Sequence, residues 1–261
     1  MTPNLTPAYP TPQHANAAEV LVDHYQGQPG IDAILLVNSC ARGKATPDSC
    51  LDMAILVPEA TDAIELEIYL HHWEDFYKSH PAFTALRHAG RYSVAHIDFW
   101  NGVFTPQEWD DGGGPDSFEL EIGNRMAYSA PLYAYGEHLQ QLLDAWLPYY
   151  DENLRLQRLR MVQDACRYDL DHVLPFVERG LYFQAFDRLY KGFQEFMQAL
   201  FIARRTYPIA YNKWIHEQVV DILNLPDLYP QLPRLFEIAN FQSTDLSYKA
   251  DQLLDLLESY T

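Results

Sequence analysis

Two short apolar runs, with a polar and turn-rich segment between them, constrain the fold of this chain more than any other feature. Residues 31–37 read IDAILLV and residues 51–57 read LDMAILV, and the segment between them reads NSCARGKATPDSC. Apolar runs of this length between turn residues are typical of buried strands. Residues 39–45 have room for one or two helical turns. We therefore predict a strand, a short helix, a loop and a second strand.

The remainder of the first half mixes strand and helix signals. Helices are predicted where apolar residues recur at helical spacing and where glycine or proline follows the pattern. Strands are predicted where short apolar or β-branched runs stand between turn residues. The predicted helices are 15–25, 61–80 and 137–147, the further strands are 92–99 and 128–135, and the glycine-rich segment 109–115 is a predicted loop.

The second half changes character after Pro148, where glycine becomes rare and long amphipathic patterns begin. Phe186, Leu189, Tyr190 and Phe193 recur at the i, i+3, i+4, i+7 spacing of one helix face. Further helices are predicted at 212–223 and 246–260. The fold class that follows is α+β, with a small mixed-sheet domain at residues 1–147, including an extended arm at 1–14, and an all-helical bundle domain at 148–261.

Charge and cysteine content limit the classes of function. The formal net charge is −18, and a surface this acidic repels nucleic-acid backbones and anionic membranes. The three cysteines form no CxxC pair, which suits a reducing cytoplasm. The first residues contain four prolines and no basic segment, so we do not expect a signal peptide. We therefore expect a cytoplasmic protein without general nucleic-acid or membrane binding.

The segment between the two apolar runs has the residues of a phosphate and metal site. A strand that leads into a short helix directs backbone N–H groups at one place, where Ser39 adds a hydroxyl and Gly43 allows a tight turn. Positions 48, 50 and 52 share one face of the second strand. Asp98 ends the third predicted strand, and it converges with Asp52 if these strands are neighbours. Carboxylates around a triphosphate are the apparatus of two-metal nucleotidyl transfer.

This pattern resembles the signature of the DNA-polymerase-β-like nucleotidyltransferase superfamily, which is Gly-Ser, about ten residues, Asp-x-Asp, and a third Asp on a later strand. Here the pattern is Asn38-Ser39, ten residues, Cys50-Leu-Asp52, and then Asp98. The Ser-Cys-Ala-Arg-Gly loop is similar to the Ser-x-Ala-Arg-Gly of bacterial antibiotic nucleotidyltransferases of the streptomycin and kanamycin types. Those enzymes also have a helical C-terminal domain.

The resemblance implies a function and a set of site residues. It implies Asp52 and Asp98 as catalytic residues that hold Mg²⁺, and a nucleotide held in a cleft between the domains. It also implies transfer of a nucleoside monophosphate from an NTP to a hydroxyl of a small-molecule or protein acceptor. A cationic acceptor would suit the acidic surface. The residues implied to bind the nucleotide are Ser39, Arg42, Gly43 and Lys213, the last in Tyr-Asn-Lys-Trp at 211–214.

Two departures from the family pattern open an alternative. Asn38 replaces the glycine, and asparagine tolerates an unusual backbone angle. Cys50 replaces the first metal-binding Asp, although Mg²⁺ prefers hard oxygen ligands to sulfur. Asp48, two residues earlier, is the residue that could supply the missing oxygen. The alternative is a catalytically inactive relative, a pseudoenzyme that binds a nucleotide or a partner protein.

Other chemistry-bearing residues have structural interpretations that compete with functional ones. Histidines 71, 72 and 96 could be metal ligands, but a histidine on a helix or strand is more often structural. Cys40 and Cys50 could pair, but small buried residues are the better interpretation. Glu119 and Glu121 share a face if residues 119–121 are extended, and a carboxylate there could act as a general base.

Overall fold

The computed structural model describes residues 5–261 as two compact units. The first unit contains residues 5–105 and Ile122–Leu147, and the second contains Pro106–Glu121 and Pro148–Thr261. The chain therefore passes into the helical unit after residue 147. The segment 106–121 also packs with the helical unit, whereas the sequence pattern assigns it to the first half.

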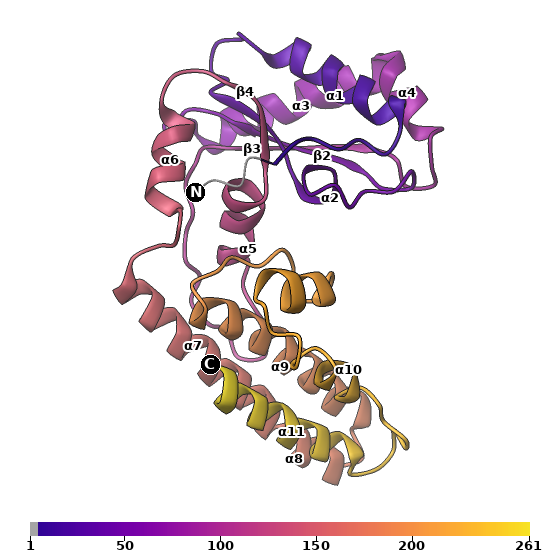
Figure 1. Ribbon diagram of the computed structural model, residues 1–261, viewed down its shortest axis with the longest axis vertical. Helices are drawn as coiled ribbons and strands as arrows, with labels where there is room; N and C mark the ends of the chain where they lie inside the picture. Colours follow the sequence, from indigo (N-terminus) through magenta and orange to yellow (C-terminus); the bar gives the residue numbers. More distant parts are fainter. Residues whose placement is uncertain (1–4) are drawn as a thin grey trace. The chain divides into compact units, whose positions relative to one another are not determined.

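A four-stranded mixed sheet forms the centre of the first unit, so the fold class is α+β as predicted (Figure 1). The strand order is β3-β2-β1-β4. β1 is antiparallel to both β2 and β4, whereas β2 and β3 are parallel. Each strand lies within, or for β3 overlaps, one of the predicted strands. The bounds are Ala33–Leu36 for β1, Leu51–Leu56 for β2, Ala95–Trp100 for β3 and Ala130–Ala134 for β4.

The two faces of β2 have different surroundings because side chains alternate along a strand. Leu51, Met53 and Ile55 are buried in one hydrophobic core with side chains of α1, α3 and α4, which lie along this side of the sheet (Figure 1). Cys50 and Asp52 belong to the alternate positions and are half-buried. The sheet therefore has a polar position on the face opposite that core.

Helix ends in the first unit follow capping chemistry. Thr11 caps α1 and Pro12 is its first residue, so residues 12–14 are helical and not part of an extended arm; residues 1–4 of the predicted arm lie outside the described residues. Asp62 caps α3, and Glu65 completes the capping box. The helical bounds are Pro12–Tyr25 (α1), Asn38–Ala41 (α2), Ala63–Ser79 (α3), Pro81–Arg87 (α4), Gly123–Ala127 (η1) and His138–Trp146 (α6).

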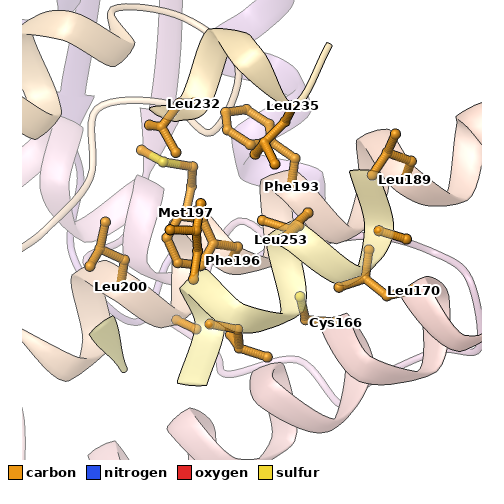
Figure 2. Close-up of a cluster of buried hydrophobic side chains, with 14 of the residues drawn as sticks. Cys166, Leu170, Leu189, Phe193, Phe196, Met197, Leu200, Leu232, Leu235 and Leu253 are labelled. Carbon is orange, nitrogen blue, oxygen red and sulfur yellow. The ribbon is translucent and has the colours of Figure 1, made fainter. Parts of the chain in front are cut away.

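Hydrophobic side chains of the long helices form the core of the second unit (Figure 2). Phe193, Phe196 and Met197 of α9 are among its buried side chains. A Cβ at Gly192 would lie 2.8 Å from Leu170 Cδ2, so the missing side chain lets α9 pack closely on α7. The bounds are Glu152–Asp171 (α7), Val173–Glu178 (α8), Tyr182–Ala203 (α9), Glu217–Ile222 (η2, a π-helix), Gln231–Arg234 (α10) and Asp245–Tyr260 (α11).

A buried ionic network joins the segment 106–121 to the helical unit. Glu119 is 0% exposed and lies in a short helix, α5 (Phe118–Ile122), which corrects the extended conformation expected there. Arg158 of α7 donates to both Glu119 carboxylate oxygens (2.5 and 2.8 Å) and to both carboxylate oxygens of Asp116 (2.9 and 2.8 Å). Tyr150 Oη and Gln198 Nε2 also donate to Glu119. Glu119 is therefore a structural anchor and not an exposed general base.

Within residues 5–261, no helix combines the length and the apolar character needed to cross a membrane.

Candidate functional site

The pairing of β2 with β3 determines which side chains lie beside Asp52. In this parallel pair Asp52 is opposite His96, and Ala54 is opposite Asp98. Side chains of paired residues extend from the same face of the sheet. His96, which sequence reasoning treated as structural, is therefore the β3 residue beside Asp52.

Cys50, Asp52 and His96 form a compact cluster of metal-ligand types. One potential ligand atom from each residue lies within 4.8 Å of the other two. The Cys50 thiol donates to Asp52 Oδ2 at 3.1 Å. Cys50 and Asp52 are half-buried and His96 is exposed. The cluster therefore contains one carboxylate, one thiol and one imidazole that solvent can reach.

Asn38 orients the carboxylate of Asp52. Its φ is +58°, in the left-handed region, and its side-chain Nδ2 donates to Asp52 Oδ2 at 3.1 Å. The backbone N–H of Val37 also donates to the Asp52 carbonyl at 3.0 Å, which continues the β1–β2 pairing up to this turn. Asparagine therefore supplies the unusual backbone angle expected of the glycine position, and it also supplies an amide donor that glycine lacks.

Three contacts from distant parts of the chain fix the loop that carries Cys50. His14 is fully buried in α1, and its ring contacts the Ser49 carbonyl through Nε2 (2.9 Å) and Thr11 Oγ1 through Nδ1 (2.7 Å). Ser93 Oγ donates to the Pro47 carbonyl at 2.5 Å. A Cβ at Gly90 would lie 2.2 Å from the same carbonyl oxygen, so only glycine permits this close approach. The backbone that precedes Cys50 is thus fixed by contacts from α1 and from residues 90–93.

The residues predicted to bind phosphate lie in and after α2. Ser39 is half-buried, and its carbonyl accepts from the Lys44 N–H at 2.9 Å. Gly43 has a φ of +68° and closes the turn after Arg42. Ala8 contacts this turn, because its N–H donates to the Cys40 carbonyl at 3.2 Å. The turn predicted from the sequence is therefore present, and the chain before α1 lies against it.

The two other predicted carboxylates have partners elsewhere. Asp98 lies two residues beyond His96 on β3, and its exposed carboxylate forms an ion pair with Arg125, whose guanidinium is mostly buried against the Trp100 ring. Asp48 is exposed, and its carboxylate accepts from the Arg91 backbone N–H at 2.8 Å. Asp48 therefore does not supply the oxygen that Cys50 lacks.

Lys213 and Cys40 are the remaining residues that the sequence pattern singled out. Lys213 belongs to the second unit; it is exposed, and its carbonyl accepts from Gln218 Nε2 at 2.8 Å. Cys40 is not in a disulfide; its thiol donates to the Cys50 carbonyl at 3.6 Å. Burial, with the nearby Asp52 carboxylate adding to it, raises the pKa of the Cys40 thiol to about 12. Cys40 is therefore an inert thiol at neutral pH.

The donor set does not fit Mg²⁺. Magnesium takes oxygen ligands in near-octahedral geometry, and the cluster offers a single carboxylate beside sulfur and nitrogen. Thiolate, imidazole and carboxylate together suit Zn²⁺ and similar transition metals. With metal–ligand distances of about 2.0–2.3 Å, the ligand atoms of one tetrahedral ion lie about 3.3–3.8 Å apart.

Sequence reasoning could have found His96 only by testing both registers of the third strand. His96 and Asp98 are both polar and share one face, so alternation alone does not decide which residue is opposite Asp52. Arg125 gave no sequence signal, because it reaches Asp98 from a segment 27 residues later.

Comparisons with known proteins give little further information. No protein-family model matches the chain, and no curated protein matches it. Among solved structures, the chain is similar to a nucleotidyltransferase-like protein from Exiguobacterium sibiricum 255-15, with 12% sequence identity and a TM-score of 0.42. The similarity covers 94% of this chain and 74% of the other. We draw no functional conclusion from a likeness at this level.

Proposed function

We propose that this chain is a nucleotidyltransferase-like protein that binds a nucleotide beside a transition-metal centre and does not catalyse Mg²⁺-dependent nucleotidyl transfer. The observation that carries the proposal is the donor set of the cluster, in which Asp52 is the single carboxylate beside Cys50 and His96. Two-metal transfer requires several hard oxygen ligands to hold two cations near the reacting phosphate.

A metal with three protein ligands keeps one position of a tetrahedron open. A phosphate oxygen of a nucleotide could occupy that position. Ser39 and the turn at Gly43 follow β1 directly and are the proposed contacts to the remaining phosphate oxygens, with Arg42 as the proposed cationic contact. Asn38 would keep the Asp52 carboxylate oriented toward the metal, because it donates to one of its oxygens.

Transfer of a nucleoside monophosphate to an acceptor hydroxyl is the competing proposal, with Asp52 and Asp98 holding Mg²⁺ and a cationic small molecule as acceptor. The contacts of Asp98 argue against it. Its carboxylate is already paired with Arg125. Asp98 also lies opposite Ala54, two residues beyond His96, the residue opposite Asp52. At a rise of about 3.3 Å per residue, Asp98 is about 6.6 Å further along the strand.

Metal binding is tested first, with Co²⁺ as a spectroscopic substitute for Zn²⁺ in the metal-stripped protein. A thiolate ligand gives a near-ultraviolet charge-transfer band that a carboxylate does not. We expect this band in the wild type, its loss in Cys50→Ser, and at least tenfold weaker binding in Asp52→Asn and His96→Gln. His72→Gln is the matched control, because His72 is an exposed histidine on α3. An unchanged spectrum in Cys50→Ser would refute the proposed centre.

Nucleotide binding and transfer are then measured with fluorescent and α-labelled ATP and GTP. We expect nucleotide binding that Zn²⁺ strengthens and Asp52→Asn weakens, with no label transferred in Mg²⁺. Wild-type transfer in Mg²⁺ that Asp52→Ala and Asp98→Ala both abolish would establish the competing proposal instead. No nucleotide binding with any of these metals would leave a metal-binding protein and overturn the nucleotide part of the proposal.

A further inference from the structure

A cavity of about 230 Å³ lies wholly within the second unit, between the segment 107–116 and helices α7 and α9. For comparison, an engineered cavity of about 150 Å³ in another protein holds benzene. One wall is apolar and includes Met161, Val162 and Ala165 of α7, and another carries Trp109. The cavity is therefore large enough for a small organic molecule.

Glu195 lines this cavity and has an unpartnered carboxylate. The residue is 1% exposed, and neither of its carboxylate oxygens has a hydrogen-bond partner among the residues that the structure describes. Buried polar groups in proteins are almost always hydrogen-bonded, and an exception requires an explanation. Trp109 also lines the cavity, and its buried indole Nε1 has no partner within the described part of the chain. Two residues of the lining therefore carry polar groups without partners, an acceptor on Glu195 and a donor on Trp109.

The cationic side chains near Glu195 form ion pairs and hydrogen bonds with other groups. Arg188 forms an ion pair with Asp169, and Lys191 contacts the Gly112 carbonyl at 2.7 Å and Asp187 at 2.9 Å. The lining contains acidic residues but no lysine or arginine among the described residues. Within the lining, only Asp116 is neutralised by a resident cation, Arg158. The cavity thus has an acidic lining in which the buried Glu195 has no counter-ion of its own.

We propose that this cavity binds a small amino alcohol, with its ammonium group on the Glu195 carboxylate and its oxygen accepting from Trp109 Nε1. Such a ligand supplies one partner to each unpartnered polar group and places its short aliphatic chain against the apolar wall. The amide oxygen of Gln198, whose nitrogen donates to Glu119 at 2.8 Å, is a second acceptor in the lining. The site lies within the second unit and does not depend on the nucleotide proposal.

The ionisation of Glu195 gives the proposal a pH signature. Burial, with Asp169 adding to it and Arg188 and Lys191 opposing it, raises the pKa of Glu195 to about 8. An ammonium ion binds the carboxylate, so binding near neutral pH releases a proton. With a pKa of about 8 the ionised fraction rises roughly 50-fold between pH 6 and pH 8, and affinity should rise with it. The surrounding elements carry other ionisable groups, which include Glu108, Asp110 and Asp116 in the lining, Arg158, Cys166, Tyr168 and Asp169 on α7, and Asp187, Arg188 and Lys191 on α9.

Isothermal titration calorimetry of the full chain tests the site, with ethanolamine as ligand and ethylene glycol as its neutral counterpart. We expect at least tenfold tighter binding of ethanolamine, a tenfold or greater gain in affinity from pH 6 to pH 8, and release of about one proton at pH 7, measured from the buffer dependence of the enthalpy. Glu195→Gln should weaken ethanolamine binding at least tenfold. Glu258→Gln, at an exposed residue of α11 outside the lining, should change it less than threefold.

Equal affinity for ethanolamine and ethylene glycol would overturn the proposal, as would equal binding by wild type and Glu195→Gln. Binding of ethanolamine without proton release would also overturn it, because the ammonium would then lie elsewhere. If Glu195→Gln does not fold, the proton release and the pH dependence of the wild type decide the question. Saturation with Mg²⁺ or K⁺ but not with ethanolamine would identify the cavity as an inorganic cation site instead.

Discussion

Replacing Arg158 with methionine should strongly destabilise the second unit. The guanidinium is 2% exposed and donates to two carboxylates, Glu119 and Asp116. Methionine keeps most of the aliphatic length of arginine and packs adaptably, but it provides no charge and no donor. The substitution therefore tests the ionic network rather than the space that the side chain fills.

The size of the effect follows from what remains around Glu119. Without Arg158, this fully buried carboxylate keeps two neutral donors, Tyr150 Oη at 2.7 Å and Gln198 Nε2 at 2.8 Å. Removing one partner of a buried ion pair costs about 3–5 kcal/mol, because the other charge stays buried. We expect about 4 kcal/mol, a large part of the roughly 5–15 kcal/mol that stabilises a typical native protein.

Urea unfolding followed by circular dichroism at the helix band measures this loss. With an m-value of about 2 kcal/mol/M, the midpoint should fall by about 2 M. Arg167→Met is the matched control on the same helix, because Arg167 is 40% exposed and lies 3.4 Å from Asp164; it should change stability by less than about 0.5 kcal/mol. A further substitution, Glu119→Leu in the Arg158→Met background, should recover part of the loss.

The reasoning is refuted if Arg158→Met costs less than about 1 kcal/mol, since the buried charge on Glu119 would then not be what the arginine compensates. A double-mutant cycle gives a second test. The reasoning is also refuted if Glu119→Leu costs as much stability in the Arg158→Met variant as it does in the wild type, since the two side chains would then act independently.

Two further predictions concern one carboxylate in each unit, Glu195 in the second and Asp62 in the first. The pKa of Glu195 is about 8 in the folded state and 4.5 ordinarily. Between pH 4.5 and pH 8, Glu195 is therefore protonated in the folded state and ionised in the unfolded chain. Stability should therefore fall as pH rises from about 5 to about 8, by up to roughly 1.4 kcal/mol per pH unit, and Glu195→Gln should flatten this slope in denaturation midpoints measured across the range. Asp62 accepts from the N–H groups of Ile64 and Glu65 at the start of α3, each at 2.9 Å. Asp62→Ala should cost about 0.5–2 kcal/mol, and Asp62→Asn, which retains a cap acceptor, should lose less in the same urea assay; equal losses would contradict the capping interpretation.

The sequence predicted elements well where local pattern and burial agree. All four strands were found within a few residues, because apolar runs between turn residues have few other solutions. The segment 118–122 was missed, since its short pattern fits either a strand or a helix. Glu119 is helical and buried because Arg158 and Gln198, remote in the sequence, meet it there. A partner that lies 39 residues away leaves no periodic signal in the chain.

The sequence by itself determined that a strand, a tight turn and a second strand bring Asn38, Cys50 and Asp52 to one place. It also determined that the third strand carries polar residues at 96 and 98 on a single face. Only the tertiary structure decided which of these two stands beside Asp52, because side-chain alternation repeats every two residues and does not distinguish them. The parallel pairing places His96 there and Asp98 opposite Ala54, where Arg125 holds its carboxylate. That two-residue difference in register changes the candidate site from a magnesium site to a cysteine, aspartate and histidine cluster.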